Sequence, residues 1–182
     1  VGLDTLICYG DTAQLNVDTT ISPGVSPYQF SWSPSASLDD SNIPAPQANP
    51  LTTTEYDLAM TDAMGCVAKD TMLVDVNPEL RVEAGNDTLI CYGDTAHIVL
   101  DTSLNGTSPL IFSWAPTNDS LNVLDSFEVF TDPVNATTYD VLVTDANSCT
   151  ATDTITVNVN PDFKINIIPD TASIFVCAGD SF

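Results

Sequence analysis

The sequence predicts an all-β protein in which two tandem sandwich modules, and the start of a third, form a linear array. Residues 4–13 recur letter for letter as residues 87–96, an offset of 83 positions, and a looser copy occupies residues 172–181. A repeat of this length indicates one structural unit used several times. Apolar and polar residues alternate with a period of two, which is typical of strands with one buried face. No segment shows the apolar spacing of three and four that a helix requires.

The repeat can be followed through the whole module, because Cys8 corresponds to Cys91 and Cys66 to Cys149 at the same offset. Modules of about eighty residues are small but lie within the range of domains that fold alone. We therefore predict a first module over 1–78, a linker over 79–86, a second module over 87–161, a linker over 162–170 and the start of a third module over 171–182.

Short strands account for most of each module. Alternating residues predict strands over 6–9, 14–17, 28–32, 54–60 and 71–76 in the first module, and over 138–144 and 153–159 in the second. The turns at 62–65 and 145–148 join the last two strands of each module into a hairpin. Roughly seven short strands in eighty residues, separated by Pro, Asn, Gly and Asp, indicate a β-sandwich of immunoglobulin type.

The charge is strongly one-sided, with 25 acidic residues, three basic residues and a net charge of −22. A chain this acidic repels nucleic acid and anionic lipid, so neither is expected as a partner. No run of eighteen apolar residues predicts a membrane span, and no signal segment opens the sequence. Because the last module stops part-way, we expect the chain to be an excerpt of a longer polypeptide.

The five cysteines are expected to form disulfides. Cys8 and Cys66 are 58 positions apart, as are Cys91 and Cys149, which favours one disulfide within each module. The partner of Cys177 is then expected near position 235, beyond this sequence. Disulfides imply an oxidising compartment outside the cytoplasm. The alternatives are buried free thiols in a cytosolic protein or a metal site, which the missing C-x-x-C spacing disfavours.

One tryptophan stands in the middle of each module. Trp32 corresponds to Trp114 at an offset of 82, because the second module is one residue shorter before this point. Each lies on a strand beside other aromatic residues and is followed by a proline turn. We predict that both are core residues; a surface ring that stacks on sugars is the alternative.

Several motifs together resemble a known family. Both modules contain F-S-W-x-P, T-D-A-x-x-C and D-T-x-x-V-x-V-N-P, and the resemblance covers essentially residues 1–182. These motifs are similar to the PKD-like immunoglobulin-fold repeats of Bacteroidota surface proteins, which occur in giant adhesins, gliding-motility proteins and type IX-secreted proteins. The W-D-F-G-D-G stretch of the better-known PKD repeats is absent. The resemblance implies an extracellular or cell-surface location.

No catalytic centre is expected. His97 departs from the repeat, where the first module has Gln14, but it has no nucleophile in a motif context. Lys69 corresponds to Thr152, so a lysine isopeptide bond is not a property of the module. Phosphate loops, H-E-x-x-H and G-x-S-x-G are absent. No cofactor is expected.

Calcium binding is the alternative interpretation of the acidic turns. Asp62 and Asp145 occupy equivalent hairpin turns, and carboxylate oxygens are suitable calcium ligands. The D-x-D-x-D-G loop is missing, however, and the two linkers carry different acids. Solvated turn aspartates are therefore favoured over a metal site.

Asp-Thr and Asp-Ser steps recur throughout the chain and resemble the O-glycosylation signal of Bacteroidota. The alternative is that these steps begin strands and form turns. The candidate glycan acceptors are Thr5, Thr12, Thr19, Thr71, Thr88, Thr95, Ser120, Thr154 and Thr171.

The favoured function is a non-enzymatic structural repeat of a long extracellular filament, stalk or adhesin, since arrays of one module commonly provide reach. Its partners would be neighbouring repeats of the same chain and other copies in a multi-chain fibre. The alternative is an adhesive or carbohydrate-binding module, or an accessory domain of a secreted hydrolase. Phe127 and Phe130, in the loop region 116–133, are the candidate contacts for a glycan or cell target.

Overall fold

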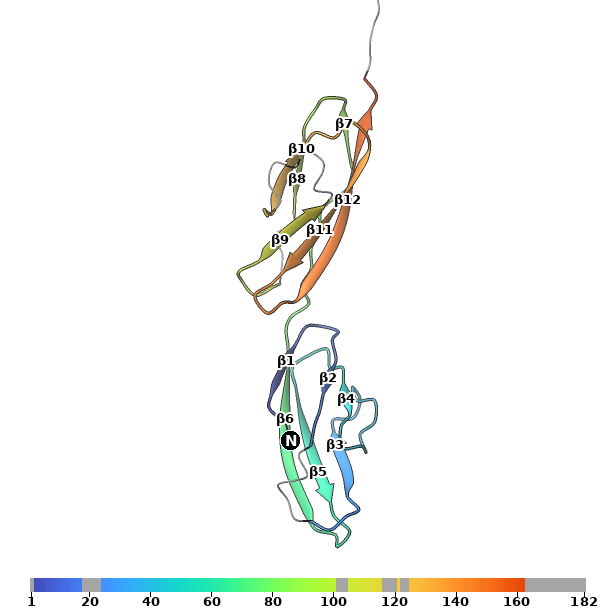
Figure 1. Ribbon diagram of the computed structural model, residues 1–182, viewed down its shortest axis with the longest axis vertical. Helices are drawn as coiled ribbons and strands as arrows, with labels where there is room; N and C mark the ends of the chain where they lie inside the picture. The colour runs from blue at the N-terminus through green and yellow to red at the C-terminus, as the bar shows by residue number, and fades with distance from the viewer. Residues whose placement is uncertain (1, 18–23, 101–104, 116–120, 122–124, 163–182) are drawn as a thin grey trace, which may run out of the picture.

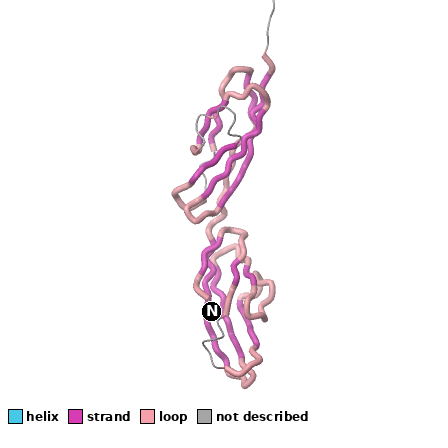
Figure 2. Tube along the Cα trace, in the orientation of Figure 1, coloured by secondary structure: helices cyan, strands magenta, loops and turns pink. Residues whose placement is uncertain are grey.

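The computed structural model describes the chain except residues 1, 18–23, 101–104, 116–120, 122–124 and 163–182. Two elongated modules lie end to end, and their described secondary structure consists of strands and connecting loops (Figures 1 and 2). None of the described residues forms a helix that is long and apolar enough to cross a membrane. The predicted third module, 171–182, lies outside the described residues.

The first module is a sandwich of a larger and a smaller sheet. The larger sheet has the strand order β1 (Thr5–Ile7), β6 (Val67–Val76), β5 (Thr54–Thr61) and β3 (Gln29–Ser33). The smaller sheet pairs β2 (Ala13–Gln14) with β4 (Gln47–Ala48). Two packed sheets of mostly antiparallel strands confirm the predicted all-β sandwich of immunoglobulin type.

The second module repeats this arrangement strand for strand. Its larger sheet has the order β7 (Thr88–Cys91), β12 (Thr150–Asn160), β11 (Thr137–Thr144) and β9 (Ile111–Ala115). Its smaller sheet pairs β10 (Glu128–Thr131) with β8 (Ala96–Val99).

One pair of strands in each module is parallel. β1 runs parallel to β6, with Ile7 opposite Val76, and β7 runs parallel to β12, with Cys91 opposite Asn160. The first and last strands of each module therefore both point toward the C-terminal end of the array. The hairpin turns β5–β6 and β11–β12 lie at the opposite end of their modules (Figure 1).

The predicted core tryptophans are buried. Trp32 is 2% exposed and Trp114 is 1% exposed, and each lies in the hydrophobic core of its own module. Their indole nitrogens donate to the backbone oxygens of Ile43, at 3.1 Å, and Ser126, at 3.0 Å. A buried indole N–H needs such an acceptor, so the rings are fixed as core residues and cannot stack on sugars.

The segment predicted as the first linker contributes to the second core. Leu80, Val82 and Ala84 are buried and pack in the cluster that contains Trp114. The backbone N–H of Ala84 also donates to the carboxylate of Asp153 at 2.7 Å. Residues 79–86 therefore do not form the predicted free linker, because every second residue from Leu80 to Ala84 faces the core. The backbone connection between the modules is correspondingly short.

Leu80→Ala is expected to destabilise the second module by about 2–5 kcal/mol, because it removes a buried leucine from the core. Native-state hydrogen exchange measures this as lower protection of the β12 amides, with the β6 amides of the first module unchanged. Arg81→Ala, a change at the exposed neighbouring residue, is the matched control. Equal effects of the two variants would show that the segment is only a tether.

Candidate functional site

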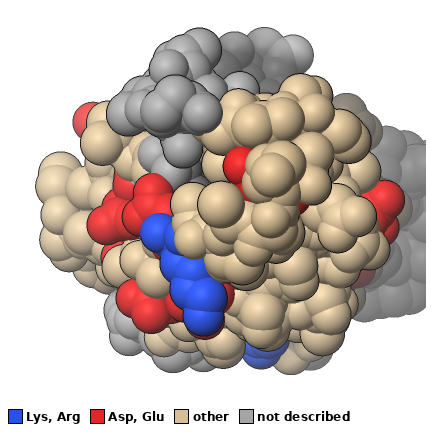
Figure 3. Space-filling view, turned by 90° about the horizontal axis from the view of Figure 1, so that it is seen from below, with Lys and Arg blue, Asp and Glu red and all other residues tan. Residues whose placement is uncertain are grey.

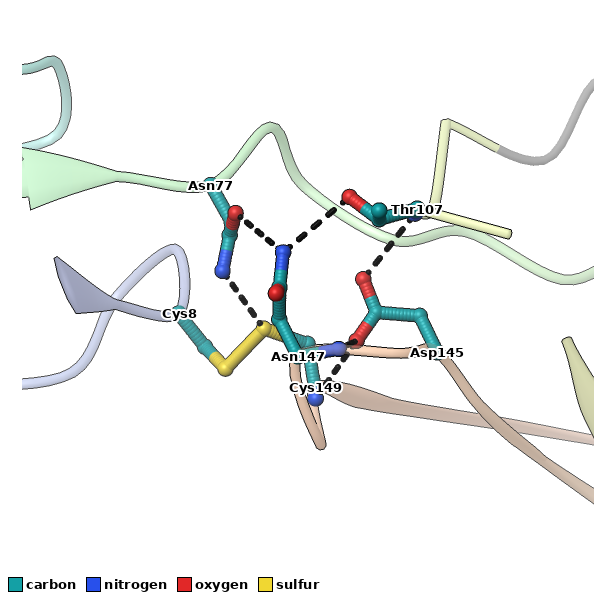
Figure 4. The surroundings of a disulfide bond; sticks show 6 residues. All are labelled: Cys8, Asn77, Thr107, Asp145, Asn147 and Cys149. Carbon is teal, nitrogen blue, oxygen red and sulfur yellow. Dashed lines mark hydrogen bonds between the residues drawn. A yellow bond between two sulfur atoms is a disulfide. The ribbon is translucent and has the colours of Figure 1, made fainter. Parts of the chain in front are cut away.

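The junction between the modules is closed by a disulfide. Cys8 follows the end of β1, and Cys149 lies in the turn that joins β11 to β12. Their Cα atoms are 5.5 Å apart and the bond spans a sequence separation of 141 (Figure 4). Each module thus contributes one cysteine to a covalent link that runs beside the backbone connection.

The predicted pairing of Cys8 with Cys66 and of Cys91 with Cys149 is wrong. Cys66 lies at the start of β6 and Cys8 beside its end, and the ten residues of β6 extend roughly 33 Å at 3.3 Å per residue. A disulfide requires Cα atoms less than about 7 Å apart. The equal spacing of 58 is also satisfied when the cysteine at one end of a module pairs with the next module. Cys66 and Cys91 are free and exposed, and Cys177 lies outside the described residues.

Asp145 organises the turn that carries Cys149. Its Oδ1 accepts the backbone N–H groups of Asn147 and Cys149, each at 2.9 Å, and its Oδ2 accepts that of Thr107 at 3.1 Å. The side chain is buried, with 5% of the residue exposed. Burial opposes the charged form, but the amides of Thr107, Cys149 and Asn147 outweigh it and hold the pKa of Asp145 below its usual range. The carboxylate therefore stays ionised and holds the turn.

Asn77 links this turn to the first module. Its Nδ2 donates to Cys149 Sγ at 3.3 Å, and its Oδ1 accepts from Asn147 Nδ2 at 2.9 Å. The same Asn147 amide donates to Thr107 Oγ1 at 3.1 Å. Asn77 is buried, and its backbone N–H donates to Ile7 at 2.9 Å, which continues the parallel pairing of β1 and β6. Both sides of the disulfide are thus held by a continuous polar network (Figure 4).

Close packing at Gly106 tightens the same end of the second module. A Cβ added at Gly106 would lie 2.7 Å from Leu80 Cδ1 and 2.9 Å from Leu110 Cδ2. A larger residue at this position would require the side chains of Leu80 and Leu110 to shift. The backbone that arrives from the first module is therefore packed against the loop next to Asp145.

The first module has the same turn at its free end. Asp62 Oδ1 accepts from Met64 and Cys66, each at 2.9 Å, and Oδ2 accepts from Val25 at 3.1 Å. The amide of Val25, followed by that of Cys66, lowers the pKa of the Asp62 carboxyl. These oxygens face N–H donors, an environment that a calcium ion would have to displace. The described residues contain no cluster of three or more His, Cys, Asp or Glu that is suited to a metal.

The candidate glycan acceptors that can be placed lie on strands or in the loops between them. Thr12, Thr71, Thr95 and Thr154 are exposed, whereas Thr5 and Thr88 are half-buried. Thr19, Ser120 and Thr171 lie outside the described residues. These sites remain a prediction, since the positions show accessibility and no modification.

The candidate binding aromatics are only partly available. Phe130 stacks on the ring of His97, with centroids 4.3 Å apart, and His97 Nε2 lies 3.1 Å from Glu128 Oε2. Phe127 is 46% exposed. A shallow groove on the larger sheet of the first module is lined by small and polar residues, among them Ser31, Asp57 and Lys69, and no aromatic ring lines it.

Comparison with known proteins identifies structural neighbours but no family. No family model matches the sequence, and no curated protein matches it. Among solved structures, the chain is similar to the insect immune protein hemolin at 12% identity and a TM-score of 0.45, over 88% of this chain and 46% of that one. It is also similar to sidekick-1 immunoglobulin domains 1–4 (14% identity, TM-score 0.37, 91% and 47% covered) and to DIP-gamma IG1+IG2 (10%, 0.36, 89% and 97%). The chain thus spans about half of the hemolin and sidekick-1 chains.

Asp145→Asn is expected to lower the free energy of unfolding at pH 7 by about 1–3 kcal/mol, because three amides lose a charged acceptor. Since the pKa of Asp145 is lower in the folded protein than its ordinary value of 3.8, the carboxylate stabilises the fold above that value. This stabilisation is lost as the pH falls through the folded pKa. The difference between variant and parent should therefore shrink below about pH 4 in urea titrations at pH 7, 5 and 3.

Asp140→Asn, an exposed position on β11, is the matched control for that titration. We expect it to have little effect at any of the three pH values. A difference between Asp145→Asn and the parent protein that stays constant from pH 7 to pH 3 would contradict the role of the ionised turn carboxylate.

Proposed function

We propose that the chain is a non-enzymatic structural repeat that carries tension along an extracellular filament, stalk or adhesin on a bacterial surface. The observation that carries the proposal is the Cys8–Cys149 disulfide, which joins consecutive modules head to tail. A disulfide persists in an oxidising compartment, which supports a location outside the cytoplasm. The motifs shared with PKD-like repeats of Bacteroidota surface proteins, including type IX-secreted ones, support the same assignment.

The disulfide changes which parts of the chain bear force. Force applied to the two ends of the chain is transmitted along β1 to Cys8, across the disulfide to Cys149 and then along β12. Residues 9–148 lie inside the closed loop and outside this path. The strands on the path are already extended, so the covalent line has little slack. While the disulfide is intact, tension along this path therefore cannot unfold either module into an extended chain.

The parallel strands support this role in a second way. β7 is continuous with the backbone that enters the second module, and β12 leads to its exit at the other end. When the disulfide is reduced and the backbone carries the load, a pull on entry and exit slides these two strands, which run in the same direction, past each other and loads their hydrogen bonds together. The net charge of −22 would keep neighbouring arrays apart and soluble.

An adhesive or carbohydrate-binding role is the second candidate, and the observation in its favour is the 46% exposure of Phe127. Phe130, its predicted companion, already has one ring face against His97. The disulfide junction involves far more of the described chain than this single exposed ring. We therefore favour the tension-carrying role.

Single-molecule pulling from the two termini tests the proposed function. In a protein with Cys66, Cys91 and Cys177 all changed to Ser, the oxidised chain should show no module-sized unfolding step. After reduction, each module should unfold with a gain of about 200–250 Å, as expected for 70–80 residues at 3.3–3.6 Å per residue less the folded length. Module-sized steps in the oxidised protein would contradict the proposal. Adding Cys8→Ser should reproduce the reduced behaviour without reductant.

A further inference from the structure

The two free cysteines stand at the two outer ends of the described pair of modules. Cys66 corresponds to Cys149 and lies in the free hairpin turn of the first module, and Cys91 corresponds to Cys8 and lies at the end of β7. Cys149 is 4% exposed inside the junction, whereas Cys66 and Cys91 are both exposed. Each end thus carries one half of the arrangement that is complete between the modules.

The Cys66 end already has the geometry of the occupied junction. Cys66 N–H donates to Asp62 Oδ1 at 2.9 Å, the distance of the equivalent bond from Cys149 to Asp145. The neighbouring loop is tied in the same way, since Ala63 N–H donates to the backbone oxygen of Val25 at 2.8 Å, as Ala146 does to that of Thr107 at 2.9 Å. The turn therefore holds its cysteine ready for a partner without rearrangement.

The Cys91 end also resembles the corresponding side of the occupied junction. In the first module, Asn77 follows β6 beside Cys8 and is buried by the next module. In the second, Asn160 pairs with Cys91 in the parallel register of β12 and β7 and is exposed. The residue that bonds to the disulfide sulfur in the junction thus has an exposed counterpart beside Cys91.

The free end of the first module is also suited to contact with another module. Val25, Met64 and Val67 are 50%, 75% and 57% exposed around Cys66. Most of this end carries neither acidic nor basic side chains, although the whole chain is strongly acidic (Figure 3). Met64 stands where the occupied junction has Asn147, so this end has an exposed apolar side chain in place of the amide that bonds Asn77. Such a surface gains free energy when it is covered.

We propose that the Cys91 end binds the Cys66 end of another module of this kind, in the head-to-tail junction seen between Cys8 and Cys149, and that the two cysteines form a disulfide. Oxidation removes two protons and two electrons from the two thiols, and a disulfide such as oxidised glutathione accepts them. The Cys91 thiolate attacks that disulfide and releases one thiolate, and the Cys66 thiolate then displaces the second.

Repeated junctions would give each module two covalent tension lines. In the first line, force passes along the backbone of residues 79–91 and is transmitted to the next module through the Cys91 disulfide. In the second line, force enters the module through the disulfide at Cys149 and passes along β12 to the next backbone connection. The two lines lie side by side as the parallel pair β7–β12. This inference concerns how modules join, and it holds whether or not the array carries tension.

Two variants of the whole chain test the inference. Both carry Cys177→Ser; one also carries Cys66→Ser and keeps Cys91, and the other carries Cys91→Ser and keeps Cys66. The variants are mixed in a glutathione redox buffer and analysed without reduction. Thiols that pair at random give about half heterodimer. We expect the Cys91–Cys66 heterodimer in several-fold excess over both homodimers together.

Asp62→Ala in the variant that keeps Cys66 should abolish this excess, because the free turn loses its three amide bonds, while the Cys8–Cys149 disulfide stays intact. Asp57→Ala, an exposed position on β5, is the matched control and should keep the excess. Random proportions, or only mixed disulfides with glutathione, would overturn the proposal. Neither outcome affects the pulling experiment, which depends on Cys8 and Cys149 alone.

The partner module is supplied either by the same polypeptide or by a second copy, and the protein isolated from its source separates these two cases. A junction within one polypeptide leaves the mass of the unreduced chain unchanged, whereas a junction between copies yields multiples that reductant converts to the single chain. Free Cys66 and Cys91 in that isolated protein, shown by complete alkylation without reduction, would overturn the inference.

Discussion

The Cys8–Cys149 disulfide is the interaction on which the rest of the arrangement depends, because it converts two small sandwiches into one covalently closed pair. The backbone alone connects the modules through the short stretch between Asn77 and Leu80, and both of these residues are buried. With the disulfide added, two covalent connections lie at one junction. Bending and separation of the modules then require both the polar network at Asn77 and the packing at Leu80 to break.

The residues around the disulfide hold its two cysteines in position. Asp145 holds the turn that presents Cys149, and Gly106 leaves room for the leucine that anchors the incoming backbone. The parallel register places Asn77 next to Cys8, so the strand end that carries one cysteine also carries the amide that bonds the other. Asp145, Gly106 and Asn77 correspond to Asp62, Gly24 and Asn160 in the other module, and for that reason the occupied junction predicts what the outer ends can bind.

Much of the fold could be predicted from the sequence, since strands, hairpins and core tryptophans follow from local alternation and from the repeat. The disulfide pairing could not, because two identical spacings of 58 fit a bond within a module and a bond to the next module equally well. Only the direction of β6, which separates Cys66 from Cys8 by the length of the module, decides between them. The alternation of Leu80, Val82 and Ala84 was present in the sequence, but the repeat, which placed the first module over 1–78, assigned this stretch to a linker.

The positions of the three basic residues allow the Cys8–Cys149 disulfide to be tested directly by digestion with trypsin. Trypsin cleaves after Lys69, Arg81 and Lys164, so Cys8 and Cys66 fall in one fragment and Cys91 and Cys149 in another. Denatured protein with its free thiols blocked is digested without reduction and its fragments are weighed. If Cys8 is bonded to Cys149, fragments 1–69 and 82–164 are recovered as one disulfide-linked species that separates on reduction. Recovery of the two fragments as separate species before reduction would contradict it.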